Sequence, residues 1–193
     1  MMKKLTLLIL ALTCLSAWSQ KPDWLKPHPE GHSVFVQGIL VDKADSTIAL
    51  SGSITIINSE EGNQSFTIKA NSMGIFQFHL VENGKYVATF EYTDYIVKKI
   101  AFDTFNVPDK VWKIGAMIDL KLSLDKRPEG FKDVVAMLPV ATFQYDPAER
   151  LFLFDLEVTD RVLKRYQAEL DRARGVTVES SEDAPVQEDS TKD

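Results

Sequence analysis

The segment from residue 74 to residue 92 constrains the fold of this chain most strongly. Apolar side chains recur at every second position on both sides of a glycine-containing turn, at Phe76, Phe78, Leu80, Tyr86, Ala88, Phe90 and Tyr92. A period of two buries one face of a β-strand and leaves the other face to water. Because only the short segment Glu82-Asn83-Gly84-Lys85 joins the two runs, the pattern predicts a β-hairpin.

The N-terminal residues have the three parts of an export signal. Lys3 and Lys4 precede a mostly apolar run over residues 5–17, and Ala17-Trp18-Ser19 supplies small residues at the two positions that signal peptidase reads. This order predicts a signal peptide over residues 1–19 that is cleaved after Ser19. The apolar run is too short for a transmembrane helix, which needs about 20 residues. We therefore expect a periplasmic or secreted protein that meets membranes only by association.

Cys14 is the single cysteine and lies inside the predicted signal peptide. A lipid-anchored cysteine follows small residues, whereas Leu12 and Thr13 precede this one. We interpret Cys14 as part of the removed signal rather than as a lipid anchor. The mature chain then has no disulfide, so packing alone must stabilise its fold in an oxidising compartment.

The charge balance argues against one class of partner. The chain carries 28 acidic and 22 basic residues, for a formal net charge of −6. An acidic chain repels phosphate backbones, and recognition of nucleic acid needs a basic patch that this sequence lacks. We expect no nucleic-acid partner.

Four regions follow the signal peptide. They are a proline-rich leader over residues 20–32, a strand-rich domain over 33–125, a mixed module over 126–175 and an acidic tail over 176–193. The tail has too few apolar side chains to offset the loss of chain entropy on folding. We therefore predict that it is disordered.

The strand-rich domain contains seven predicted strands. They cover residues 34–42, 53–58, 65–70, 75–80, 86–92, 96–104 and 114–124. From the second strand onward, apolar residues occupy even-numbered positions and polar residues are more frequent at odd ones. Seven short antiparallel strands of this kind predict a mainly β fold, a two-sheet sandwich of the immunoglobulin or transthyretin type.

The mixed module predicts a small hairpin and a helix. Strands over 140–145 and 151–155 flank Asp146-Pro147-Ala148-Glu149, which suits a type I turn. A helix is predicted over 160–174, with Thr159 or Asp160 as its cap and Gly175 at its end. Its apolar stripe consists of Val162, Leu163, Tyr166, Leu170 and Ala173. We expect this stripe to pack on the hairpin or the sandwich; the alternative is a stripe that binds a partner.

Several pieces of the strand-rich domain occur in a familiar order. They are Val36-Gln37-Gly38-Ile39-Leu40-Val41-Asp42, Leu50-Ser51-Gly52-Ser53-Ile54-Thr55-Ile56, Asn71-Ser72-Met73-Gly74-Ile75-Phe76-Gln77-Phe78, Gly84-Lys85-Tyr86-Val87 and Tyr92-Thr93-Asp94-Tyr95. Residues 33–125 thereby resemble the carboxypeptidase regulatory-like domain, a transthyretin-like β-sandwich of bacterial envelope proteins. The resemblance implies a non-catalytic module in the cell envelope.

Residues for catalysis or metal binding are sparse. The chain has three histidines, His28, His32 and His79, and neither a Gly-x-Ser-x-Gly nor a Gly-x-x-x-x-Gly-Lys motif. His28 and His32 would share one face of a helix, but Pro27 and Pro29 oppose a helix there. We therefore expect no enzyme, no catalytic residue, no cofactor and no metal site.

Two tryptophans are candidates for contact with a partner. Trp24 lies in the leader and Trp112 in the connection before the last predicted strand. Exposed aromatic side chains would indicate contact with a protein or a sugar, while the alternative is that they cover the ends of the sandwich. The sequence thus predicts a non-catalytic exported envelope protein that acts as an interaction or assembly module. The alternative function is a carbohydrate-binding accessory protein of a polysaccharide-utilisation system.

Overall fold

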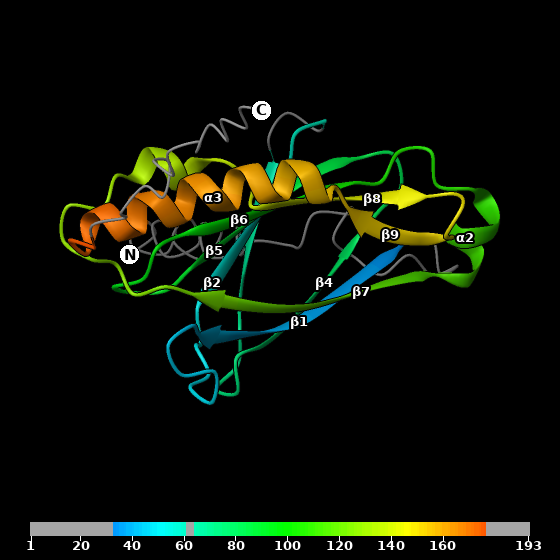
Figure 1. The fold of residues 1–193 in the computed structure, drawn as a ribbon. Coiled ribbons are helices and arrows are strands. Elements are labelled where there is room, and N and C mark those ends of the chain that lie inside the picture. Colours follow the sequence, from blue (N-terminus) through cyan, green and yellow to red (C-terminus); the bar gives the residue numbers. More distant parts are fainter. Residues whose placement is uncertain (1–32, 61–63, 177–193) are drawn as a thin grey trace, which may run out of the picture.

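The computed structural model describes residues 33–60 and 64–176, which form two facing β-sheets with one long helix against the larger sheet (Figure 1). The three-stranded sheet has the order β4-β1-β7, and the six-stranded sheet has the order β3-β2-β5-β6-β8-β9. The strands are β1 (Val34–Asp42), β2 (Ser53–Asn58), β3 (Gln64–Lys69), β4 (Ile75–Leu80), β5 (Lys85–Glu91), β6 (Lys98–Asp103), β7 (Ala116–Leu124), β8 (Ala141–Asp146) and β9 (Leu151–Phe154). The predicted signal peptide, the leader to residue 32 and the tail from residue 177 lie outside the described residues.

The alternation of even and odd residues produces the core of the sandwich, as the sequence predicts. Large even-numbered side chains are at most 4 % exposed, namely Ile54, Ile56, Phe76, Phe78, Leu80, Tyr86, Phe90, Ile100, Phe102 and Ile118. Aromatic rings join the two sheets, because Phe76 of β4 packs edge-on against Phe90 of β5 with ring centroids 5.2 Å apart. Each such buried side chain contributes roughly 1.5–3 kcal/mol relative to an exposed one.

The predicted hairpin over residues 74–92 is wrong. β4 pairs with β1 in the three-stranded sheet, whereas β5 pairs with β2 and β6 in the six-stranded sheet, so the turn between β4 and β5 connects the two sheets. A period of two identifies the buried face of each strand but does not determine its partner, and here the two buried faces pack against each other across the core.

A second departure from the predicted antiparallel arrangement is a parallel pair. β1 and β7 run parallel, from Val34 beside Ala116 to Asp42 beside Leu124. The chain reaches β7 from the opposite sheet through the short helix α2 (Asp109–Ile114), so the strand enters beside the start of β1. Gly38 permits the close approach, since a Cβ there would lie 2.3 Å from the Leu120 carbonyl oxygen.

The prediction of a strand beginning at residue 114 is wrong by two residues. Ile114 is the last residue of α2 and is 75 % exposed, and β7 begins at Ala116. Gly115 separates the two elements with a φ of 84°, a conformation that glycine adopts without steric cost. Its N–H bonds to the carbonyl oxygen of Val111 and ends the helix.

The predicted second hairpin is present as β8 and β9. The two strands pair antiparallel, and β8 also pairs in parallel with β6, so the hairpin extends the six-stranded sheet. At the turn, the Asp146 carboxylate accepts the backbone N–H of Ala148 at 2.8 Å. Arg150 follows with a φ of 58° and places the chain at the start of β9.

The long helix α3 (Leu156–Ala173) begins four residues before the predicted start. Asp155 caps it rather than Thr159 or Asp160, because its side chain accepts the backbone N–H of Val158 at 3.0 Å. The predicted end at Gly175 is confirmed: Gly175 has a φ of 71° and its N–H bonds to the Arg172 carbonyl oxygen.

α3 packs through Tyr166 and Leu170, which are at most 2 % exposed. They lie with Ile96, Phe131 and Ala136 in a second apolar cluster, to which the 3₁₀ helix η3 (Asp133–Met137) contributes. Leu163 does not belong to the buried face, since it is 40 % exposed. The apolar stripe of α3 therefore packs against the rest of the protein, as predicted, but fewer of its residues are buried. Within the described residues, the helices are too short or too polar to span a bilayer.

Candidate functional site

Two buried carboxylates lie at one end of the three-stranded sheet. Asp42 is the last residue of β1 and Asp125 directly follows β7, and these strands are parallel neighbours. Their carboxyl ends therefore meet at the same edge of the sheet. Asp42 is 2 % exposed and Asp125 is 3 % exposed, so each needs partners to offset the loss of hydration.

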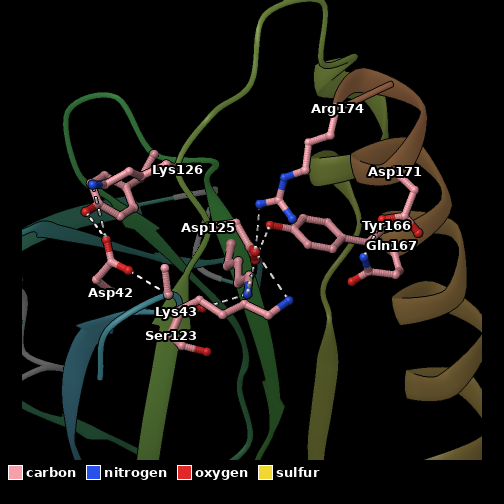
Figure 2. A network of polar contacts seen from close by, with 12 residues as sticks. Asp42, Lys43, Ser123, Asp125, Lys126, Tyr166, Gln167, Asp171 and Arg174 are labelled. Carbon is pink, nitrogen blue, oxygen red and sulfur yellow. Dashed lines mark hydrogen bonds and ion pairs between the residues drawn. The ribbon is translucent and has the colours of Figure 1, made fainter. Parts of the chain in front are cut away.

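Asp125 has four such partners, namely Lys43, Lys98, Tyr166 and Arg174 (Figure 2). We call these four residues and Asp125 the Asp125 cluster. The ammonium groups of Lys43 and Lys98 each lie 3.2 Å from its carboxylate, and the Arg174 guanidinium lies 3.6 Å away. The Tyr166 hydroxyl donates a hydrogen bond to it at 2.9 Å. The partners come from β6, the loop after β1 and α3, so the cluster ties three distant parts of the chain together.

Lys98 is the other buried charge of this cluster, with 7 % of its surface exposed. Its ammonium donates to the Ser123 carbonyl oxygen at 2.6 Å and lies 5.1 Å from the centre of the Tyr166 ring. Burial lowers the pKa of Lys98, while the Asp125 carboxylate acts in the opposite direction. The Asp125 carboxylate thus favours the ammonium form of Lys98.

The pKa of Asp125 is also set by burial and by its charged partners, which act in opposite directions. Burial acts to raise it, but the Lys98 ammonium, the Tyr166 hydroxyl and the Lys43 ammonium together hold it below the ordinary aspartate value. Burial and the adjacent carboxylate raise the pKa of Tyr166, so its hydroxyl keeps its proton and remains a donor. The cluster is therefore a set of satisfied ion pairs and hydrogen bonds.

Asp42 organises the turn after β1. Its carboxylate accepts the backbone N–H groups of Ala44 at 2.6 Å and Asp45 at 3.0 Å, and the Tyr95 hydroxyl at 2.5 Å. The Tyr95 bond and the two N–H groups outweigh burial and lower the pKa of Asp42. The same carboxylate raises the pKa of Tyr95 to about 12. Lys126 approaches Asp42 to 3.9 Å from the solvent side (Figure 2).

The open surfaces of the molecule lie away from these carboxylates. A pocket of about 520 Å³ is found between α2 and the turn of the β8–β9 hairpin. A broader hollow of about 670 Å³ lies on the outer face of the three-stranded sheet, over Gln37, Gln77 and Asp119. None of the residues of the Asp125 cluster lines either one. The cluster is suited to fixing α3 on the sandwich. The surfaces that could bind another molecule lie elsewhere on the protein.

The structure places the two tryptophans of the sequence hypothesis differently. Trp112 lies on α2, is 2 % exposed and belongs to the main core. Such a side chain has no surface to offer a partner and instead covers the end of the sandwich. Trp24, like Cys14, His28 and His32, lies outside the described residues. His79 is half-buried, with its Nδ1 3.1 Å from the Ser33 hydroxyl.

Sequence reasoning missed the Asp125 cluster, although one signal for it was present. Lys98 occupies an even-numbered position in a strand whose even residues, Ile100 and Phe102, are core residues. A lysine at such a position must be buried beside an acid. Nothing in the sequence spacing indicates that the acid is Asp125, because the pair forms only when β7 crosses to the opposite sheet.

Comparison with known proteins finds no matching family model and no matching curated protein. The resemblance to the carboxypeptidase regulatory-like domain therefore stays a prediction. Three solved structures have partial similarity. The Bacillus anthracis TIE protein is 21% identical over 49% of this chain and 17% of that chain, with a TM-score of 0.38. The group B streptococcus pilus 2b backbone protein is 9% identical over 48% of this chain and 41% of that chain, with a TM-score of 0.33.

A catechol 1,2-dioxygenase from Acinetobacter is 12% identical over 58% of this chain and 57% of that chain, with a TM-score of 0.38. The chain thus spans less than two thirds of the length of each of these three proteins. All three are β-sandwich proteins, as this chain is. Similarities at this level concern architecture and carry no information about activity.

Proposed function

We propose that this chain is a non-catalytic exported envelope protein that acts as an interaction or assembly module, with a carboxypeptidase regulatory-like sandwich as its scaffold. The observation that carries the proposal is a group of exposed apolar side chains in β9 and the first turn of α3, two elements that follow one another directly in the chain (Figure 1). We call it the β9–α3 patch; it consists of Leu151, Leu153, Phe154, Leu156 and Val158. Each of these side chains is at least 40 % exposed, and Leu156 is 70 % exposed.

Several large apolar side chains within eight consecutive residues are unusual on a free surface. Contiguous apolar patches on soluble proteins commonly mark sites where another molecule binds. Burial of such groups in a partner would contribute about 25 cal/mol for each Å² removed from water. β9 is also the last strand of its sheet and is only four residues long, a position at which exposed apolar residues favour contact with other chains.

The distribution of charge supports a binding module over an enzyme. The densest group of ionisable side chains, the Asp125 cluster, is saturated by its own contacts and is centred on a carboxylate that is 3 % exposed. Catalytic acids and bases, in contrast, meet substrate in a cleft. The exposed part of the molecule offers apolar contact area instead.

A photo-crosslinking residue at position 156 of the full chain tests this proposal in the native cell envelope. We expect one dominant crosslinked partner, and a crosslinker at the exposed position Lys69 on β3 serves as the control. The variant Leu153→Glu/Leu156→Glu should weaken binding of that partner by tenfold or more while unfolding changes by less than about 0.5 kcal/mol. Equal crosslinking from positions 156 and 69 would contradict the proposal.

Carbohydrate binding is the second candidate, and the outer face of the three-stranded sheet favours it. The strand registers place Gln77 of β4, Gln37 of β1 and Asp119 of β7 in one row, inside the hollow of about 670 Å³. Gln37 donates to Asp119 at 2.6 Å. Side-chain amides and carboxylates in such a row present donors and acceptors that match sugar hydroxyls.

A glycan array separates this candidate from the first one. Sugar binding at the sheet face predicts a signal that disappears in Gln37→Ala/Gln77→Ala and persists in Leu153→Glu/Leu156→Glu. Both glutamines lie on the outer face, so the stability of the sandwich should change little in the first variant. An array without signal for the full chain would contradict carbohydrate binding at the sheet face.

A further inference from the structure

The pocket between α2 and the β8–β9 turn has a chemical character of its own. Its apolar lining includes Val111, Ile114 and Tyr145, and Pro108 and Pro147 complete its walls. The charged residues that line it are both cations, Lys110 and Arg150. We call this pocket the α2 groove. It fits a ligand that combines an apolar centre with negative charge.

The two cations of the α2 groove are available for such a ligand. Both side chains are exposed, and neither forms an ion pair with another residue in the described ranges 33–60 and 64–176. Asp109 and Glu149, their neighbours in sequence, do not line the groove. The groove is thus a local cationic site on a protein whose net charge is −6.

One segment of this chain has the complementary pattern. Residues 182–189 read Glu-Asp-Ala-Pro-Val-Gln-Glu-Asp, so the short apolar stretch Ala-Pro-Val has a pair of acids directly before it and another pair after one glutamine. Its apolar stretch matches the apolar lining of the α2 groove, and its acids match the two cations that also line it. We propose that the α2 groove binds residues 182–189 of a second copy of this chain.

Chain length is the reason for choosing a second copy. α3 has 18 residues and is about 27 Å long. α2 and the β8–β9 turn, whose residues line the groove, lie beyond the first residue of α3, at the opposite end from its last (Figure 1). From Val176 to Pro185 the chain spans at most about 32 Å when fully extended. A tail that returned to its own groove would be stretched to its limit, whereas a tail from another molecule is under no such constraint.

This contact would have a defined consequence for assembly. The groove of one copy takes the tail of the next, so each copy keeps one unused groove or tail for a further neighbour. Such head-to-tail contacts form a ring where the rotation between copies closes and an open chain of molecules where it does not. The inference goes beyond the proposed function, because it concerns a different surface from the β9–α3 patch.

Sedimentation velocity of the full chain, over a range of protein concentrations and at low and high salt, tests the inference. We expect the average mass to rise with concentration and the association to weaken at high salt, since exposed charge pairs are screened. The variant Lys110→Glu/Arg150→Glu should weaken self-association by about tenfold or more. A matched control, Lys69→Glu/Lys121→Glu, makes the same change of charge at exposed positions outside the groove and should associate as the unmodified chain does.

A charge-reversed tail supplies the rescue experiment. The variant Glu182→Lys/Asp183→Lys/Glu188→Lys/Asp189→Lys should lose self-association alone and regain it when mixed with Lys110→Glu/Arg150→Glu. A chain that is monomeric at every concentration would overturn the inference, even if it binds a labelled peptide of residues 177–193. Self-association that requires Leu153 and Leu156 but not Lys110 and Arg150 would also overturn it, while supporting the proposed function.

Discussion

Asp125→Ala should lower the free energy of unfolding by about 3–5 kcal/mol, because it removes one partner from a buried ion pair. Lys98 would remain 7 % exposed with its ammonium beneath Tyr166, and only the Ser123 carbonyl oxygen would still bind it. The Tyr166 hydroxyl would lose its acceptor at the same time. Equilibrium denaturation in urea, followed by tryptophan fluorescence, measures the loss.

Two variants show whether the loss comes from the unpaired lysine. Asp119→Ala removes an exposed aspartate from β7, next to β1, and should change stability by less than about 0.5 kcal/mol. Lys98→Met/Asp125→Leu removes both charges, and we expect it to be more stable than Asp125→Ala because no buried charge is left without a partner. If the double variant is as unstable as Asp125→Ala, the cost arises from lost contacts with α3 rather than from Lys98.

The pH dependence of stability follows from the sign of the Asp125 shift. Its pKa in the folded protein is below the ordinary value of 3.8, so the folded state favours the ionised form. This stabilisation is complete at pH values above the unfolded pKa and is lost as the pH falls through the folded pKa. The Asp125→Asn variant should therefore have a shallower decrease in stability below about pH 4 than the unmodified chain.

Alternation in the sequence predicts the sandwich and the buried face of each strand, because the period of two is a local property of the chain, but it does not predict that β4 and β5 belong to different sheets. The even-numbered residues of β4 and β5 lie in the core as predicted. Strand direction is a different kind of property. The parallel pairing of β1 with β7 joins residues about 80 positions apart, and it depends on the path of the chain through α2 rather than on any local pattern.

The same distinction applies to the candidate surfaces. The apolar run Leu151-Phe152-Leu153-Phe154 is visible in the sequence, but its exposure results from the position of β9 as the last strand of the sheet. The sequence does not predict the α2 groove, because its pattern before β7 favours a connection followed by a strand. Pro108 accepts the N–H of Val111 with its carbonyl oxygen and starts a helix there. Apolar periodicity over six residues is too short to reveal such a helix.

Trp112→Ala should cost about 3–5 kcal/mol of unfolding free energy, since it removes a large side chain that is 2 % exposed in the main core. α2 follows β6 and leads into β7, so the cavity would open at the point where the chain crosses between the two sheets. Ile114→Ala is the matched control, because Ile114 lies on the same helix but is 75 % exposed and should change stability little. Urea denaturation followed by circular dichroism measures both.

Trp112 was also a candidate for partner contact, and the two roles predict opposite results. A core role predicts a large loss of stability with unchanged partner crosslinking from position 156 in the molecules that remain folded. If Trp112→Ala is too unstable to purify, Trp112→Phe keeps most of the volume and should be destabilised less, by the smaller cavity that it leaves. A Trp112→Ala chain of unchanged stability would contradict the packing of α2 described above. A tryptophan that covers the end of the sandwich cannot be removed without exposing the apolar residues beneath it.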